Sequence, residues 1–277
     1  MIHILKKIIK TFPFLFVVIF INYQTSAKDR LIIGTSTSTY DSGLMSYLED
    51  SFEKEFNYNL DVISKGTGQI LEIAKIGLID ILIVHHEKSE KEFMINGYGK
   101  KRYKIMYNDY VIVGPKDDPA KISEAKNLED ALKNIYNSDS LFISRSDNSG
   151  THFKEMELWK FAKIDTLLFG PKYKKIGSGM GATLNLTNNI RAYTITDRST
   201  WATFKNKENL KILFEGSTKL FNQYSLILVN QKKGLLKNSM QEIFVKWILS
   251  KNGEKLINNY KINNLQLFYF NGEHYIN

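Results

Sequence analysis

The sequence predicts an α/β protein of two lobes with mixed, mostly parallel sheets, and three observations support this class. Short apolar segments alternate with helical patterns along the chain, as in sheets covered by helices. Some segments are apolar throughout, as strands buried on both faces are. The 277 residues suffice for one large or two ordinary domains. The order of the segments predicts two strands that join the lobes, one near Val111 and one near Phe221.

Strands are expected wherever a short apolar run ends in turn-forming or polar residues. The first run, 31–34, passes directly into the hydroxyl residues 35–39, and the third run, 79–84, is apolar except for Asp80. A turn rich in proline and aspartate, 115–119, ends the fourth. In chain order the expected strands are 31–34, 60–64, 79–84, 107–114, 141–143, 192–195, 210–214 and 225–229.

Helices are expected where apolar residues recur at helical spacing between these strands. Gly77 can end the second helix, and Asn127 is a suitable N-cap for the third. Ser239 and Glu242 have the spacing of a capping box, which predicts the start of the last helix. In chain order the expected helices are 44–56, 70–76, 128–135, 153–162 and 240–248.

Composition narrows the possible functions. The chain has 38 Lys and Arg against 29 Asp and Glu, a net charge of +9 that favours an anionic partner. Nucleic acid and membrane surfaces are alternatives, but the lysines are dispersed, and the two clusters, 100–102 and 172–175, are interpreted as solvated surface. The chain has no cysteine, which excludes disulfides, cysteine-ligated metals, thiol catalysis and a cysteine-linked lipid.

The first 27 residues have the three regions of a secretory signal peptide. Residues 1–11 are basic, and the apolar run that follows is about 10 residues, against the roughly 20 that span a bilayer. Residues 22–27 are polar and end in small side chains, so cleavage is expected after Ala27; an uncleaved anchor is the alternative. We therefore expect a periplasmic protein that is not a lipoprotein.

Three loops rich in Gly, Ser and Thr follow expected strands, at 35–43, 65–69 and 144–151. Ligands of parallel α/β sheets bind at the carboxyl ends of strands, where helix N-termini offer unpaired N–H groups to anions. Arg145 adds a planar fork that can bind two oxygens of one oxyanion. These loops predict a site that binds an oxyanion but does not catalyse a reaction. A metal site at 85–87 is not expected, because neighbours on a strand point to opposite faces.

A secreted serine hydrolase is the rival from another class. Ser149 or Ser178 would be the nucleophile, and His85, His86 or His152 the base. No Gly-x-Ser-x-Gly elbow surrounds either serine. We therefore expect a binding protein and not an enzyme.

The segment 144–151 resembles the anion-binding segment of the phosphate-binding branch of periplasmic solute-binding proteins. The chain as a whole is more similar to the tungstate-binding component of tungstate ABC importers. The family's Thr-Thr-Thr-Ser motif appears as 35–38, with Ser36 for the second threonine. The matching segments are 35–44, 65–69, 80–85, 106–109, 113–119, 144–160 and, beyond them, 179–184.

The resemblance implies a type II periplasmic binding fold, with lobe 1 at 28–110, lobe 2 at 111–221 and a return to lobe 1 at 222–277. It implies a monomer without cofactor that delivers tungstate or molybdate to a membrane permease, and no nucleic acid as partner. A phosphate- or sulfate-binding protein of the same fold is the alternative. The implied ligand-binding residues are Thr37, Ser38, Thr67, Arg145, Ser149, Gly150 and Thr151, followed by Ser36, His85 and Gly181.

His85 bears on selectivity within this resemblance. Phosphate binders place a carboxylate to accept the phosphate proton, and the spacing after Asp80 puts His85 at that position. Tungstate and molybdate are fully ionised dianions, which an acceptor-only carboxylate would repel. A histidine that donates favours them over phosphate. The sequence does not rank tungstate against molybdate.

Overall fold

The computed structural model describes residues 29–231 and 234–274, so the expected signal peptide lies outside the described residues. The longer strands are β1 (Asp29–Ser36), β2 (Tyr58–Lys65), β3 (Ile81–Val84), β4 (Gly99–Pro115), β8 (Leu210–Phe214) and β9 (Phe221–Val229). The shorter ones are β5 (Phe142–Ser144), β6 (Tyr173–Lys175), β7 (Thr194–Asp197), β10 (Lys261–Ile262), β11 (Leu265–Gln266) and β12 (Tyr269–Phe270).

The helices lie between these strands. The α-helices are α1 (Thr37–Asp41), α2 (Leu44–Glu55), α3 (Thr67–Lys75), α4 (Glu87–Ile95), α5 (Leu128–Asn137), α6 (Gly150–Phe161), α7 (Met180–Asn189), α8 (Arg198–Thr203), α9 (Gly234–Ile248) and α10 (Lys251–Asn259). Three 3-10 turns complete the order, at Ile122–Glu124, Thr166–Lys172 and Thr218–Leu220.

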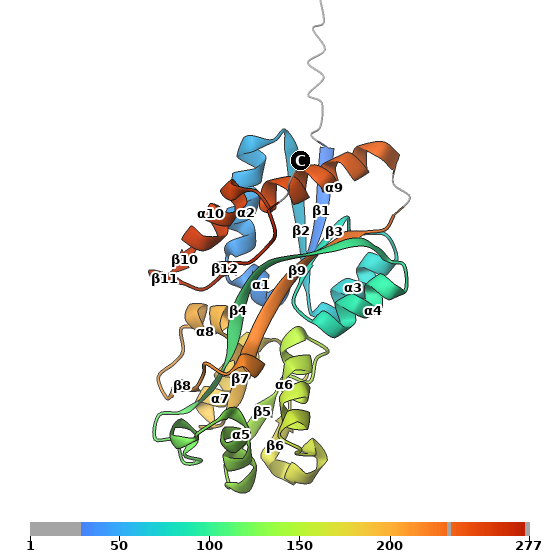
Figure 1. Ribbon diagram of the computed structural model, residues 1–277. Coiled ribbons are helices and arrows are strands. Elements are labelled where there is room, and N and C mark those ends of the chain that lie inside the picture. The colour runs from blue at the N-terminus through green and yellow to red at the C-terminus, as the bar shows by residue number, and fades with distance from the viewer. Residues whose placement is uncertain (1–28, 232–233, 275–277) are drawn as a thin grey trace, which may run out of the picture.

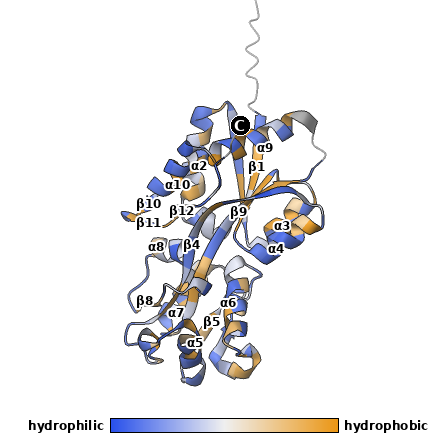
Figure 2. Cartoon of the chain, in the orientation of Figure 1, coloured by the Kyte–Doolittle hydropathy of each residue, from blue (hydrophilic) through white to orange (hydrophobic). Residues whose placement is uncertain are grey.

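The upper lobe in Figure 1 is a sheet covered by helices on both faces, in the strand order β12-β4-β9-β3-β1-β2. Alternate residues of β3 belong to different cores: Ile81 and Ile83 pack with α2 and α9, whereas Leu82 and Val84 pack with α3 and α4. Burial on both faces explains why β3 has no polar residue. Figure 2 shows this hydrophobic centre in the strands, with hydrophilic residues on the helices around it.

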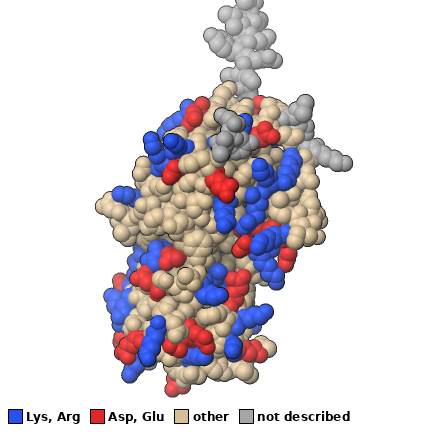
Figure 3. All heavy atoms as spheres, in the orientation of Figure 1, with Lys and Arg blue, Asp and Glu red and all other residues tan. Residues whose placement is uncertain are grey.

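The lower lobe has its own core, formed by α5, α6 and the far end of β4. β4 pairs with β9 over Gly99–Asp109 and then with β7 over Tyr110–Val113, so this one strand serves both lobes. β9 makes the return crossing (Figure 1). Figure 3 shows basic and acidic side chains interspersed over the lower lobe, without a large patch of one sign.

The mixed α/β class is confirmed, but the expectation of mostly parallel pairing is wrong. Parallel ladders join β1 to β2, β1 to β3 and β5 to β6, whereas β4 and β9 pair antiparallel with every strand they contact. The reason is directional. The chain leaves the upper lobe along β4 and returns along β9, so the two crossing strands run in opposite directions.

Most expected elements are present, but the helices α1, α4, α7, α8 and α10 were not predicted. Asn127 caps α5 through its side chain, and Gly77 follows α3 with a φ of 84°. Ser239 lies inside α9, which begins at Gly234, so the predicted capping box is wrong. Arg102 is not simply solvated surface, because it forms a 2.6 Å ion pair with the buried Glu90.

A buried carboxylate ties the crossing strands together. One oxygen of Asp197 accepts hydrogen bonds from the amides of Asn108 (3.0 Å) and Asn222 (2.9 Å) and from the hydroxyl of Tyr224 (2.7 Å). The other oxygen caps α8. Asn108 comes from β4, Asn222 and Tyr224 come from β9, and Asp197 itself ends β7, so this carboxylate fixes the junction where the chain passes between the lobes.

Replacing Asp197 by asparagine is expected to lower the free energy of unfolding by about 3 kcal/mol, because an amide cannot accept from all of these buried donors. Urea unfolding followed by circular dichroism measures the change. The exposed Asp139→Asn is the matched control and should be neutral. A D197N protein as stable as the parent would contradict the role of this junction.

Candidate functional site

The predicted loops meet between the two lobes. The upper lobe contributes the start of α1, the start of α3 and the carboxyl end of β3, and the lower lobe contributes the loop from β5 into α6. Local sequence explains the helix starts: the side chains of Ser36 and Ser149 cap α1 and α6. The first N–H groups of such helices have no acceptor within the helix.

The upper-lobe wall is rich in hydroxyls. Ser38 Oγ lies 3.2 Å from His85 Nε2 and 3.1 Å from Ser36 Oγ. Ser36 is also occupied in the cap of α1, and Thr37 is the half-buried first residue of that helix. Thr67 Oγ1 is fully buried and has no hydrogen-bond partner. A buried hydroxyl without a partner is costly, so it marks a place where an acceptor is missing.

The lower-lobe wall is built around Arg145, which is buried except for 3% of its surface. Asp147 holds the guanidinium through Nε (3.2 Å) and Nη2 (2.6 Å). Nη1 lies 3.5 Å from the hydroxyl of Thr151. The carboxylate therefore orients the fork, and Nη1 faces the start of α6.

Gly150 brings the two walls into contact. A Cβ built on this glycine would lie 3.1 Å from Thr67 Oγ1 and 3.2 Å from His85 Nε2. The structure thus gathers Ser38, Thr67 and His85 of one lobe around Gly150 of the other, with Arg145 and Thr151 beside them. Gly181, by contrast, is exposed at the start of α7, with no atom within 4 Å of its Cβ position.

The lobes close over this cluster through direct contacts. The Gly68 N–H donates to the carbonyl of Asn148 at 3.1 Å. The His86 ring stacks on Phe153 with 4.5 Å between centroids, and its Nε2 lies 3.4 Å from Glu157. A cavity of about 450 Å³, lined by His85, Gly150 and several lysines, adjoins the cluster. The described conformation is therefore a closed one.

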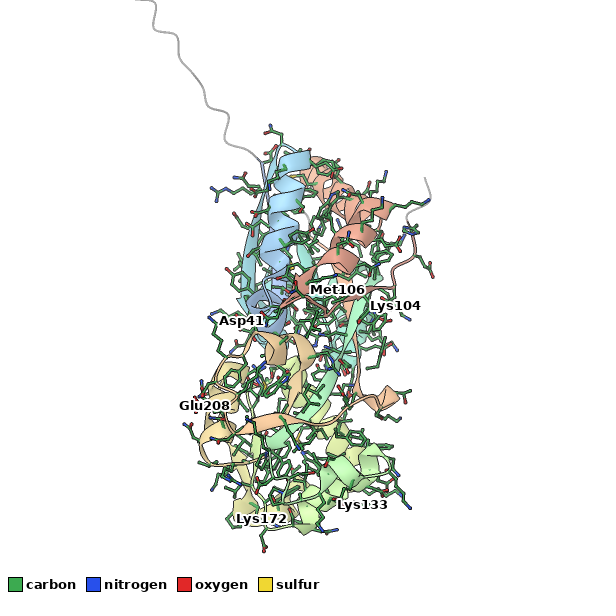
Figure 4. The ribbon with its side chains drawn as sticks, turned by 90° about the vertical axis from the view of Figure 1, so that its left-hand side faces the viewer. Asp41, Lys104, Met106, Lys133, Lys172 and Glu208 are labelled. Carbon is green, nitrogen blue, oxygen red and sulfur yellow. The ribbon has the colours of Figure 1, made fainter. Side chains whose placement is uncertain are left out.

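The closed arrangement shifts the pKa values of three ionisable side chains near the lobe boundary. Burial lowers the pKa of His85 to about 4, so the ring is neutral at pH 7. Burial raises the pKa of Asp41, against the opposing effect of Arg145 across the lobe boundary. Figure 4 shows Asp41 at that boundary. The hydrogen bond from His86 lowers the pKa of Glu157.

Sequence reasoning missed the residues behind His85. Nδ1 of this ring lies 3.0 Å from both Tyr110 Oη and Asn222 Oδ1, which come from the two crossing strands. Asn222 is 137 positions from His85, and no local pattern links them. Asp147 lies in the segment 144–151 that the sequence analysis singled out, but its role in orienting Arg145 was not predicted.

Other chemistries find little support in the described residues. Ser149 Oγ accepts from the His152 N–H, and Ser178 Oγ donates to the Ile176 carbonyl, so neither predicted nucleophile is bonded to an imidazole ring. Within residues 29–231 and 234–274, no three His, Asp or Glu side chains form a cluster that could hold a metal ion. No helix in these ranges is long and apolar enough to cross a membrane.

Two lobes joined by two crossing strands and closed on a polar cluster define a ligand-capturing protein of the periplasmic-binding type. Comparison with known protein families, sequences and structures agrees with this class. The pattern of the PBP superfamily domain matches residues 22–252. The tungstate-binding protein TupA of Peptoclostridium acidaminophilum is 41% identical over 240 residues, which cover 86% of this chain and 83% of that protein.

Two solved structures agree in sequence and fold. The tungstate ABC transporter structure from Geobacter sulfurreducens is 44% identical, with a TM-score of 0.76 over 83% of this chain and 98% of that one. The tungstate-binding protein TupA from Desulfovibrio alaskensis G20 is 37% identical, with a TM-score of 0.77 over 88% and 100%. The chain belongs to the PBP superfamily and, within it, to the family of these tungstate-binding proteins. The expected resemblance, fold class and role as a binding protein rather than an enzyme are confirmed.

Proposed function

We propose that this protein captures tungstate between its lobes for uptake by an ABC transporter. The observation that carries the proposal is the buried, unpartnered Thr67 hydroxyl, which faces Gly150 at the N-terminus of α6. A hydroxyl donor, free N–H groups and a guanidinium meet there. Hydrogen bonds to a charged group are each worth about 1.5–3 kcal/mol, so a few of them hold a small dianion tightly.

The ligand-binding residues in this proposal are those that surround the Thr67–Gly150 contact. Ser38 and Thr67 act from the upper lobe, with Thr37 beside them at the start of α1. Gly150 and Thr151 offer backbone N–H groups, Arg145 supplies the charge, and Ser149 fixes the helix start by its cap. Ser36 Oγ lies 3.1 Å from Ser38 Oγ and so helps to position it. Gly181 contributes only as part of the first turn of α7.

Location and partners follow from the same proposal. Residues 1–27 act as a signal peptide cleaved after Ala27, and the mature monomer works in the periplasm with a membrane permease. Lobe 1 comprises 28–110 and 222–277, and lobe 2 comprises 111–221. The absence of cysteine agrees with a protein that carries no cysteine-linked lipid.

A competition titration tests the function. Calorimetry on the mature chain, with tungstate, molybdate, sulfate and phosphate added in turn, is expected to show tungstate or molybdate binding at least about 100-fold tighter than phosphate. That ratio corresponds to about 2.7 kcal/mol. Phosphate or sulfate binding tighter than tungstate would replace the proposal by the alternative ligand class.

A further inference from the structure

The buried ring of His85 has one side toward the crossing strands and one toward the anion site. Nδ1 faces Asn222 Oδ1 and Tyr110 Oη, and Nε2 faces Ser38 Oγ. The ring stacks on Tyr224 with 4.8 Å between centroids. Which nitrogen bears the proton at neutral pH decides whether His85 donates to an anion or presents a lone pair.

Asp197 decides that question through Asn222. The Asp197 carboxylate only accepts, so the group of Asn222 that contacts it at 2.9 Å is the amide NH₂. The same NH₂ donates to Asn108 Oδ1 at 2.7 Å. Turning the Asn222 amide over would set its oxygen against two acceptors. Its Oδ1 must therefore face His85.

An amide oxygen only accepts, so its 3.0 Å contact with Nδ1 is a hydrogen bond only when Nδ1 carries the proton. Tyr110 Oη, also 3.0 Å from Nδ1, can accept as well as donate and fits this state. The opposite tautomer would place the Nδ1 lone pair against Asn222 Oδ1. The neutral ring therefore has an unprotonated Nε2, which accepts a hydrogen bond from the Ser38 hydroxyl. In this state Ser38 has no proton left for an anion, and the donor role expected of His85 requires a second proton on its ring.

We propose that capture of the dianion is coupled to uptake of one proton at His85 Nε2, with Asn222 and Asp197 as positioning residues that direct the proton to that nitrogen. This rests on the proposed function. The proton comes from solvent and no other bond breaks. Once Nε2–H has formed, it donates toward Ser38 or the anion, and the Ser38 hydroxyl is free to donate to the anion as well.

The charges around the ring give the sign of the effect. In the closed conformation without an anion, burial lowers the pKa of His85 to about 4, Asp197 and the Asn222 hydrogen bond raise it, and His86 and Arg145 lower it. A bound dianion adds a strong stabilisation of the protonated form. The groups facing the ring are Asp197, Arg145, His86, Tyr110 and Tyr224.

By linkage, the affinity must then rise as the pH falls through the pKa of His85 in the complex, and level off once the pH lies below the pKa of His85 in the ligand-free protein. Between these limits the dissociation constant falls by up to tenfold per pH unit. Above both pKa values the affinity is independent of this group.

The test measures dilute sodium tungstate binding by calorimetry from pH 8 to pH 5, in pairs of buffers with different ionisation enthalpies. The parent protein is expected to take up protons and to bind more tightly as the pH falls. The variant His85→Gln should take up none through this residue and respond only to the ionisation of the anion, which is the same for both proteins. The exposed His274→Gln, which removes a histidine paired with Glu254, is the matched control and should behave like the parent.

A direct observation of the ring keeps the inference falsifiable if a variant fails to fold. Nitrogen-15 NMR of the parent protein at pH 7 should show His85 with Nδ1 protonated and Nε2 bare, and both protonated in the tungstate complex at pH 5.5. Asn222→Ala should lose the preference for Nδ1. An Nε2–H tautomer, or tungstate binding with the pH profile of H85Q, would overturn the inference; a parent protein that binds no tungstate would overturn the proposed function instead.

Discussion

Replacing Arg145 by alanine is expected to weaken tungstate binding by about 100- to 10,000-fold, while the protein stays folded. The guanidinium can give one or two hydrogen bonds to the anion, each worth about 1.5–3 kcal/mol when the acceptor is charged. The change also leaves Asp147 without its 2.6 Å partner, and this carboxylate would then repel the dianion. Calorimetry gives the affinity, and thermal unfolding gives the stability.

Two further variants separate the charge from the geometry. Arg145→Lys keeps the charge but loses the fork, so it should recover only part of the affinity. Arg191→Ala removes an arginine whose ion pair with Asp117 is exposed, and it should bind tungstate like the parent. Unchanged binding in R145A would show that the anion does not sit at the start of α6.

The second large effect is expected for Gly150→Ala, which places a methyl group in the gap between the lobes. The new Cβ would lie 2.9 Å from His85 Cε1, and the ring cannot move away because Asn222 holds it. Overpacking of this kind costs about 1–3 kcal/mol. Because it acts only on the closed form, affinity should fall by about 10- to 100-fold with little loss of stability.

Gly181→Ala is the matched control for this prediction. Gly181 also lies in the first turn of a lower-lobe helix, but a Cβ there meets nothing within 4 Å. Its tungstate affinity should equal that of the parent in the same titration. Small-angle scattering should show G150A remaining open at tungstate concentrations that close the parent. A G150A protein that closes and binds normally would contradict the contact between Gly150 and His85.

The sequence alone determined much of the local structure and the pieces of the candidate site. Hydroxyl and glycine residues at the ends of apolar runs predicted where helix N-termini lie, because caps depend on residues only a few positions apart. The structure bears this out at Ser149, whereas the short helix α1 that Ser36 caps was not predicted. Arg145 could be selected early because its neighbours in the chain are also its neighbours in space.

Only the tertiary structure decided how these pieces act together. Three features depend on partners that lie far apart in the chain. They are the antiparallel pairing of β4 with β9, the contact of Gly150 with Thr67, and the nitrogen of His85 that carries the proton. Asp197 orients Asn222, and Asn222 in turn orients His85, through hydrogen bonds whose donors and acceptors meet only once both lobes have folded. Hydrogen bonds are directional and short, so residue types alone do not specify them.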